Sequence, residues 1–349
     1  MSTKKERNQL IDVIKAIAII LVIVGHSIQY GAGEMFFNTQ SYFDNGLFKF
    51  IYSFHMPLFM LVSGYLFYFS TIKHSLNHNI KTRIFSLLLP IAIWTLPQFI
   101  YYIIQNSLNI SIIQIILKFT SFMRNNLWFL WAVLLCSIIV LIVNRLFKDS
   151  VIIYIIGIVA TLFVPDIIPA VYKFMLPYFI LGYLFNKYFT ITFKRIFSVK
   201  KNQFICLGLS GLIFIILLIF FNRDSYIYTS GFYILKESNY LFQLAIDTYR
   251  FIIGLFGSIF IISSVKLVWN KLPKFIISSL SYIGKYSLGI YILSGYIFIY
   301  LLPLITAQNI GLDYVNVCLH SVVIMTISLV MSIIITKIPL LNKLLFGGR

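Results

Sequence analysis

The stretch VIKAIAIILVIVGHSI, residues 13–28, decides the fold class. It is aliphatic almost throughout, and two ionisable side chains interrupt it, Lys15 near one end and His26 near the other. A helix needs about 20 apolar residues to cross a bilayer core about 30 Å thick, so the stretch and its flanks predict a membrane span. The ionisable pair needs an explanation, because charged and polar groups are costly in lipid.

The rest of the chain has the composition of a polytopic membrane protein. Of its 349 residues, 60% are hydrophobic and 11% are charged, whereas soluble domains are about 25% charged. We therefore predict an all-α, polytopic integral membrane protein with about ten transmembrane helices, both termini cytoplasmic, and residues 1–349 in a single transmembrane domain. The candidate spans are roughly residues 10–30, 48–70, 84–106, 127–146, 150–165, 172–189, 204–221, 244–268, 282–306 and 315–340.

The positions of the charges predict the orientation and explain the formal net charge of +18. With a cytoplasmic N-terminus, 20 of the 28 Lys and Arg residues fall in cytoplasmic segments, and most acidic residues fall outside. This distribution follows the positive-inside rule, so the basic excess indicates membrane topology and not nucleic-acid binding. Cys136, Cys206 and Cys318 lie in apolar runs without pairing or ligand spacing, which argues against a disulfide framework or a metal site.

The polar residues of the first predicted helix share one face. Lys15 and His26 are 11 residues apart, and 11 steps of about 100° come within about 20° of three full turns. Asp12 lies three residues before Lys15, where the two side chains can pair. The helical rise separates Lys15 from His26 by about 16 Å. The face therefore suggests a polar site, and the alternative is that Lys15 snorkels to the inner headgroups while His26 makes a structural hydrogen bond.

The second and third predicted spans carry further polar groups. In FIYSFHMPLFMLVSGYLF, residues 50–67, His55 lies near the predicted depth of His26, and Ser63-Gly64 offers a small surface for close helix approach. Lys81 and Arg83 precede the third span on its cytoplasmic side. They are either a positive-inside anchor or contacts for a polyanionic cytosolic ligand.

This ordered set of motifs resembles the membrane-bound acyltransferase family 3, over almost the whole chain. The resemblance lies in Lys15 followed after ten residues by His26, in FHMPLFMLVSGYLF (54–67), in the basic residues before LLLP (87–90), in LWFL (127–130) and in IGKYSLGIYIL (283–293). Lys15 and the His55-Met56-Pro57 triplet resemble the fucose 4-O-acetylase-like subgroup. Many relatives carry arginine at position 15 and histidine at position 294, where this chain has Ser294, so we assign Ser294 no catalytic role. We expect no appended extracytoplasmic SGNH-type domain such as some relatives carry.

The resemblance implies an O-acyltransferase of the cell (plasma or inner) membrane. Its donor would be cytosolic acyl-CoA, most often acetyl-CoA, and its acceptor a sugar hydroxyl on an extracytoplasmic or membrane-linked glycan. Lys15, Lys81 and Arg83 would hold the coenzyme A phosphates, and Asp12 would fix Lys15. His26 would take the proton of the hydroxyl or carry the acyl group. His55 would orient the acceptor or bind the oxyanion; no metal and no permanently bound cofactor is expected.

Two other classes of membrane protein compete with this interpretation. A non-enzymatic exporter or flippase of a polysaccharide or its lipid-linked precursor would have no need for a face that combines a deep cation with a histidine. An ion-coupled transporter would need carboxylates in mid-span, whereas all ten acidic residues lie at the ends of predicted spans or in loops.

Overall fold

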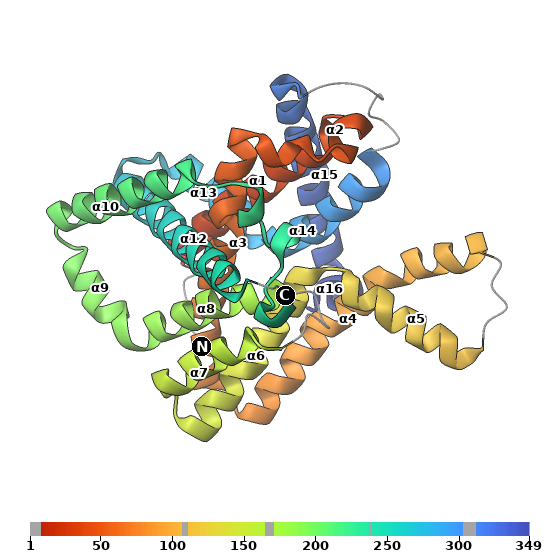
Figure 1. Cartoon of the computed structure of the whole chain (residues 1–349), viewed down its shortest axis with the longest axis horizontal. Helices are drawn as coiled ribbons and strands as arrows, with labels where there is room; N and C mark the ends of the chain where they lie inside the picture. Colours follow the sequence, from red (N-terminus) through yellow and green to blue (C-terminus); the bar gives the residue numbers. More distant parts are fainter. Residues whose placement is uncertain (1–7, 107–110, 165–170, 237–238, 303–311, 349) are drawn as a thin grey trace. The chain divides into compact units, whose positions relative to one another are not determined.

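The computed structural model describes residues 8–106, 111–164, 171–236, 239–302 and 312–348 (Figure 1). Within these ranges the secondary structure is helical and contains no strand, which confirms the all-α prediction. The ends of the predicted segments 150–165 and 282–306 lie partly outside the described residues. Residues 1–7 and 349 also lie outside the described residues, so the prediction that both termini are cytoplasmic falls on residues that are not described.

Seven helices of the described residues are long and apolar enough to cross a membrane, and each coincides with one predicted span. The chain is therefore a multi-pass membrane protein. The seven helices are α1 (Gln9–Gly31), α3 (Gly46–Lys73), α4 (Leu76–Asn106), α6 (Trp128–Phe147), α10 (Lys200–Ile219), α12 (Tyr240–Val268) and α15 (Tyr314–Lys337).

The other three predicted spans have a different form. The segment 282–306 is not one helix: α13 (Lys274–Lys285) and α14 (Ser287–Tyr296), which the π-helix η6 (Ile297–Leu301) continues, meet at a bend of 63°. α7 (Val151–Thr161) has 11 residues, about 16 Å of rise and too little to cross the bilayer core alone. α8 (Val171–Leu184) is followed by the π-helix η2 (Phe185–Phe189). The bent pair would make an eighth span, and the count of ten stays a prediction.

The chain divides into two compact units that are interleaved in sequence. The first comprises Met1–Val62, Phe189–Tyr226 and Tyr249–Ile333. The second comprises Ser63–Tyr188, Ile227–Thr248 and Ile334–Arg349.

In the first unit, small residues allow helices to approach closely. α1 packs along α13, and a Cβ added at Gly284 would lie 1.8 Å from the carbonyl oxygen of Asp12. On α12, a Cβ at Gly257 would meet Phe54 and Phe214 at 2.6 and 2.8 Å. Shorter elements of this unit are α2 (Glu34–Asn38), η1 (Ser41–Asp44), α9 (Thr190–Ile196), η3 (Arg223–Ser225) and η5 (Trp269–Lys271).

The second unit is built around α4, α6 and α8. A Cβ at Gly64 would lie 1.9 Å from the carbonyl oxygen of Phe179, which confirms the predicted close approach at Ser63-Gly64. Figure 1 shows α4 (orange) beside α5 (yellow; Ile112–Asn125). α16 (Pro339–Phe346) packs on α4, where Trp94 donates a hydrogen bond to the carbonyl of Leu345 at 3.0 Å. The unit also contains α11 (Ile227–Ser230) and η4 (Ile234–Lys236).

Candidate active site

His26 lies in the first unit beside Gln29 and Tyr52. Its Nδ1 is 3.3 Å from Oε1 of Gln29 and 3.3 Å from the hydroxyl of Tyr52, which itself donates to Gln29 at 3.2 Å. These contacts join α1 to α3, so the two histidine-bearing helices are neighbours, as the sequence interpretation assumed. Aromatic rings enclose the imidazole, with Phe298 at 5.6 Å and Tyr30 at 5.8 Å between centroids.

His55 is reached through the same tyrosine. The ring of Tyr52 packs edge-on against His55 with centroids 4.8 Å apart, while its hydroxyl contacts His26. His55 is 4% exposed, and its Nδ1 lies 2.7 Å from the carbonyl oxygen of Ile51 one turn earlier. Tyr52 therefore connects the two candidate catalytic histidines within one unit.

The hydrogen-bond partners define the neutral form of both imidazoles. A backbone carbonyl can only accept a hydrogen bond, so Nδ1 of His55 carries its proton and the Nε2 lone pair is left to accept. The same argument applies to His26, because Oε1 of Gln29 is also an acceptor. Each neutral ring thus presents Nε2 as a base or hydrogen-bond acceptor.

Lys15 and Asp12 form the predicted pair on α1. Nζ of Lys15 lies 3.4 Å from Oδ1 of Asp12, and the side chains are 18% and 5% exposed. The tight contact of Gly284 with the Asp12 backbone fixes this end of α1 against α13. The pairing expected from the three-residue spacing is confirmed, and the role of Lys15 toward a ligand stays a prediction.

Lys81 and Arg83 lie in the second unit, in the first turns of α4. Lys81 is exposed. The guanidinium of Arg83 lies 4.5 Å from the centroid of the Phe67 ring, a cation–π contact that orients it. The structure brings His26, His55, Lys15 and Asp12 together in one unit and places these two cations in the other.

Tyr52 and Gln29 are site residues that the sequence interpretation missed. Tyr52 precedes His55 by three residues, and Gln29 follows His26 by three, so each shares a helix face with a histidine. That spacing was a usable signal, although the contact between α1 and α3 could not be read from it. Ser294 is fully buried, and its hydroxyl donates to the carbonyl of Tyr291 at 3.3 Å.

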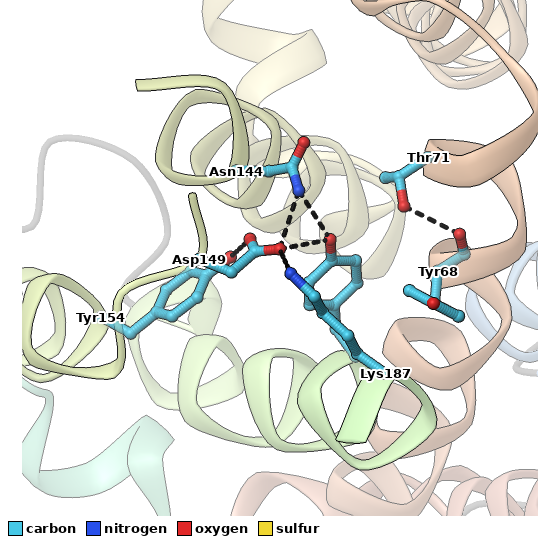
Figure 2. A network of polar contacts seen from close by, with 7 residues as sticks. Tyr68, Thr71, Asn144, Asp149, Tyr154 and Lys187 are labelled. Carbon is cyan, nitrogen blue, oxygen red and sulfur yellow. Dashed lines mark hydrogen bonds and ion pairs between the residues drawn. The ribbon is translucent and has the colours of Figure 1, made fainter. Parts of the chain in front are cut away.

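A second polar cluster, also missed, surrounds Asp149 at the turn between α6 and α7 in the second unit (Figure 2). Its carboxylate accepts hydrogen bonds from Asn144 (2.7 Å), Tyr154 (2.7 Å) and Tyr183 (3.0 Å), and pairs with Lys187 at 2.5 Å. Burial alone would raise the pKa of this carboxyl, but the hydrogen bonds from Lys187, Tyr154 and Asn144 outweigh it and hold the pKa below its usual value. So many donors make Asp149 a structural anion.

The family follows from comparison with known proteins. A family model described as an acyltransferase domain matches residues 8–337. The chain belongs to the acyltransferase 3 family. Nodulation protein NolL of Mesorhizobium japonicum is 31% identical over 187 residues, 51% of this chain and 48% of that protein. Nodulation protein NolL of Sinorhizobium fredii is 31% identical over 189 residues, with 51% and 49% covered.

The chain spans about half the length of these curated relatives. No solved structure matches it. Family membership and the apolar helices together make this an acyltransferase domain embedded in a membrane.

Proposed function

We propose that the protein is a plasma- or inner-membrane O-acyltransferase that moves an acetyl group from cytosolic acetyl-CoA to a sugar hydroxyl of an extracytoplasmic or membrane-linked glycan. The observation that carries the proposal is the linkage of His26 on α1 to His55 on α3 through Tyr52. Lys15 and its partner Asp12 lie further along α1. The family supplies the reaction class, and this linkage connects two histidines within one unit.

The donor binds, in this proposal, with its phosphates at the cytoplasmic end of α1. Lys15 provides a point charge that Asp12 holds in place. Phosphate contacts from Lys81 and Arg83, which belong to the second unit, stay a prediction. The rise of about 16 Å from Lys15 to His26 suits a long, thin pantetheine arm that carries the thioester toward the histidines. Binding at remote phosphates then positions the reacting carbonyl.

The transfer needs a base at the acceptor hydroxyl. Nε2 of His26 takes the hydroxyl proton as the oxygen attacks the thioester carbonyl carbon. The tetrahedral intermediate collapses with cleavage of the C–S bond, and the proton passes from His26 to the departing coenzyme A sulfur. An acyl-histidine relay would use the same nitrogen as nucleophile.

The tautomer of His55 supports one of its two expected roles. Because Nδ1–H donates to Ile51, the neutral ring has an acceptor at Nε2 and no second donor for an oxyanion. His55 therefore orients the acceptor by accepting a hydrogen bond from a sugar hydroxyl. Tyr52 is a positioning residue, since it holds His26 through Nδ1 and packs on His55.

Inverted membrane vesicles supplied with radiolabelled acetyl-CoA test the function. We expect labelled glycan from the wild-type protein and about a 10²–10⁴-fold loss with His26→Gln, because glutamine keeps a hydrogen bond but cannot exchange a proton. His320→Gln, which changes another histidine of the same unit, is the matched control and should remain active. Unlabelled glycan from abundant, folded wild-type protein would refute the proposal and favour an exporter or flippase.

A further inference from the structure

Four aromatic rings form a continuous series that starts beside His26 in the first unit. Tyr30 follows His26 by one turn on the same face of α1, and their centroids are 5.8 Å apart. Tyr30 is stacked on Phe298 at 6.0 Å and 28°, and on Phe37 at 5.1 Å and 23°. Phe37 is in turn stacked on Tyr42 at 6.2 Å and 20°. The four rings are thus nearly parallel to their neighbours and extend from the histidine toward α2 and η1.

The series is buried at Tyr42 and exposed at Phe37. Tyr42 is 6% exposed and packs edge-on against Phe48 at 5.1 Å, and Phe48 stacks on Tyr52 at 3.8 Å. Phe37, in contrast, is 37% exposed. Tyr30 is intermediate in exposure. The accessible aromatic surface is therefore the part of the series formed by Tyr30 and Phe37.

Polar groups border the same rings. Gln29 contacts both His26 and Tyr52, and a hydrogen bond with Gln29 counteracts the rise that burial causes in the pKa of the Tyr42 hydroxyl. At the rim, Arg223 pairs with Asp44 at the end of η1. An aromatic face with polar groups at its margin matches a pyranose, which has apolar C–H faces and hydroxyls around its edge.

We propose that Tyr30 and Phe37 form the acceptor subsite, where a pyranose ring of the glycan stacks and directs one hydroxyl at Nε2 of His26. The inference rests on the proposed function and extends it by assigning where the acceptor binds. By the predicted orientation of α1, Tyr30 lies about 6 Å further outward than His26. An acceptor that arrives from outside therefore meets these rings before it reaches the base.

The main test is a comparison of acceptors. Purified full-length protein receives radiolabelled acetyl-CoA and one soluble acceptor, either a methyl pyranoside (fucoside, glucoside, galactoside, mannoside or N-acetylglucosaminide) or glycerol. We expect transfer to at least one pyranoside, and we expect Tyr30→Ala and Phe37→Ala to raise the KM for it about 3–10-fold, the range of a lost aromatic stack. The KM for acetyl-CoA should rise much less than the KM for the pyranoside.

Two further variants separate stacking from packing. Phe37→Leu keeps apolar volume without a ring and should be as impaired as Phe37→Ala, whereas Phe37→Tyr should resemble wild type. Phe275→Ala, which removes a 71% exposed ring on α13, is the matched control. A pyranoside KM that stays unchanged in Tyr30→Ala and Phe37→Ala, or full activity in Phe37→Leu, would overturn the acceptor subsite.

The outcomes also separate this inference from the proposed function. Acetyl transfer to glycerol but to none of the pyranosides would overturn the proposal that the acceptor is a pyranose. The proposal that the protein is an acetyltransferase would stand. If the wild-type protein transferred acetyl to no acceptor and consumed no acetyl-CoA, the proposed function itself would be overturned. Normal pyranoside kinetics in the ring variants would overturn only the location of the acceptor.

Discussion

Replacement of Asp149 by asparagine should destabilise the second unit strongly. The carboxylate is fully buried and is paired with Lys187, whose side chain is 25% exposed. Breaking a buried ion pair costs about 3–5 kcal/mol, and the partial exposure of Lys187 favours the lower end, about 3 kcal/mol. Asparagine also directs an amide donor at groups that are themselves donors. At about 1.4 kcal/mol per factor of ten, the equilibrium for opening should rise about 100–200-fold.

The backbone makes asparagine the right substitution. Lys148 and Asp149 have φ values of 51° and 61°, in the left-handed region. Asparagine tolerates this region nearly as well as aspartate, so the variant isolates the loss of charge. Alanine would add backbone strain of about 1 kcal/mol or more. Tyr154→Phe, which removes one donor and leaves the ion pair, should raise the opening equilibrium only about 10–30-fold.

Cys136 provides the assay. This cysteine lies on α6 in the same unit and is fully buried, whereas Cys318 is exposed. In a background with Cys206→Ser and Cys318→Ser, a thiol-reactive dye in detergent can modify Cys136 only when the unit opens, so the labelling rate reports the opening equilibrium. An increase of less than about fivefold in Asp149→Asn would refute the proposed contribution of the network.

The pH dependence of the same assay gives an independent check. The folded-state pKa of Asp149 is lowered, so its contribution to stability is fully present above the unfolded value near 3.9 and is lost as the pH falls through the folded value. The ratio of the labelling rate of Asp149→Asn to that of the wild type should be constant from about pH 7 to 5. It should fall toward one below about pH 4. A ratio of labelling rates that already falls between pH 7 and 6 would contradict the lowered pKa of Asp149.

The remaining predictions concern orientation, donor binding and packing. Cysteine introduced within 222–243 should react with an impermeant thiol reagent outside intact cells, and cysteine within 190–200 should not; the reverse pattern would invert the topology. Lys15→Ala should raise the KM for acyl-CoA about 5–100-fold, with Lys15→Arg near wild type, and an unchanged KM would mean that Lys15 only snorkels. Gly284→Ala should sharply reduce the folded protein recovered by size-exclusion chromatography, since its methyl group would lie 1.8 Å from a carbonyl oxygen. Gly295→Ala, where a Cβ meets nothing within 4 Å, should not.

Features that depend on one helix or on one small residue could be predicted from the sequence. The three-residue spacing of Asp12 and Lys15 was sufficient to predict their ion pair. The small side chains at Ser63-Gly64 were sufficient to predict a close helix contact, although not that Phe179 would be the partner. Hydropathy located the seven long helices found among the described residues, because burial in lipid imposes one simple requirement on every span.

The partners that residues find on other helices could not be predicted. The partners of Asp149 on η2 and α8 lie 38 and 34 residues away, and no periodicity links them. The spacing of Tyr52 from His55 placed both residues on one face of α3, but it could not show that the Tyr52 hydroxyl reaches His26 on α1. The bend between α13 and α14 contains no proline, so the local sequence 283–289 did not mark it.

The interleaving of the two units has a consequence for how the protein is made. Each unit draws on three stretches of chain, and the last of these are 249–333 and 334–349. The final contacts on α4 form late. Trp94 cannot make its hydrogen bond until Leu345 has been synthesised. Gly347, with a φ of +71°, packs against the carbonyl of Ser86, where a Cβ would lie only 2.1 Å from the oxygen. During translation α4 must therefore remain in the bilayer without this partner until about 250 more residues have been added. Helices inserted early are then the segments that most need protection by the insertion machinery, because their partners are synthesised last.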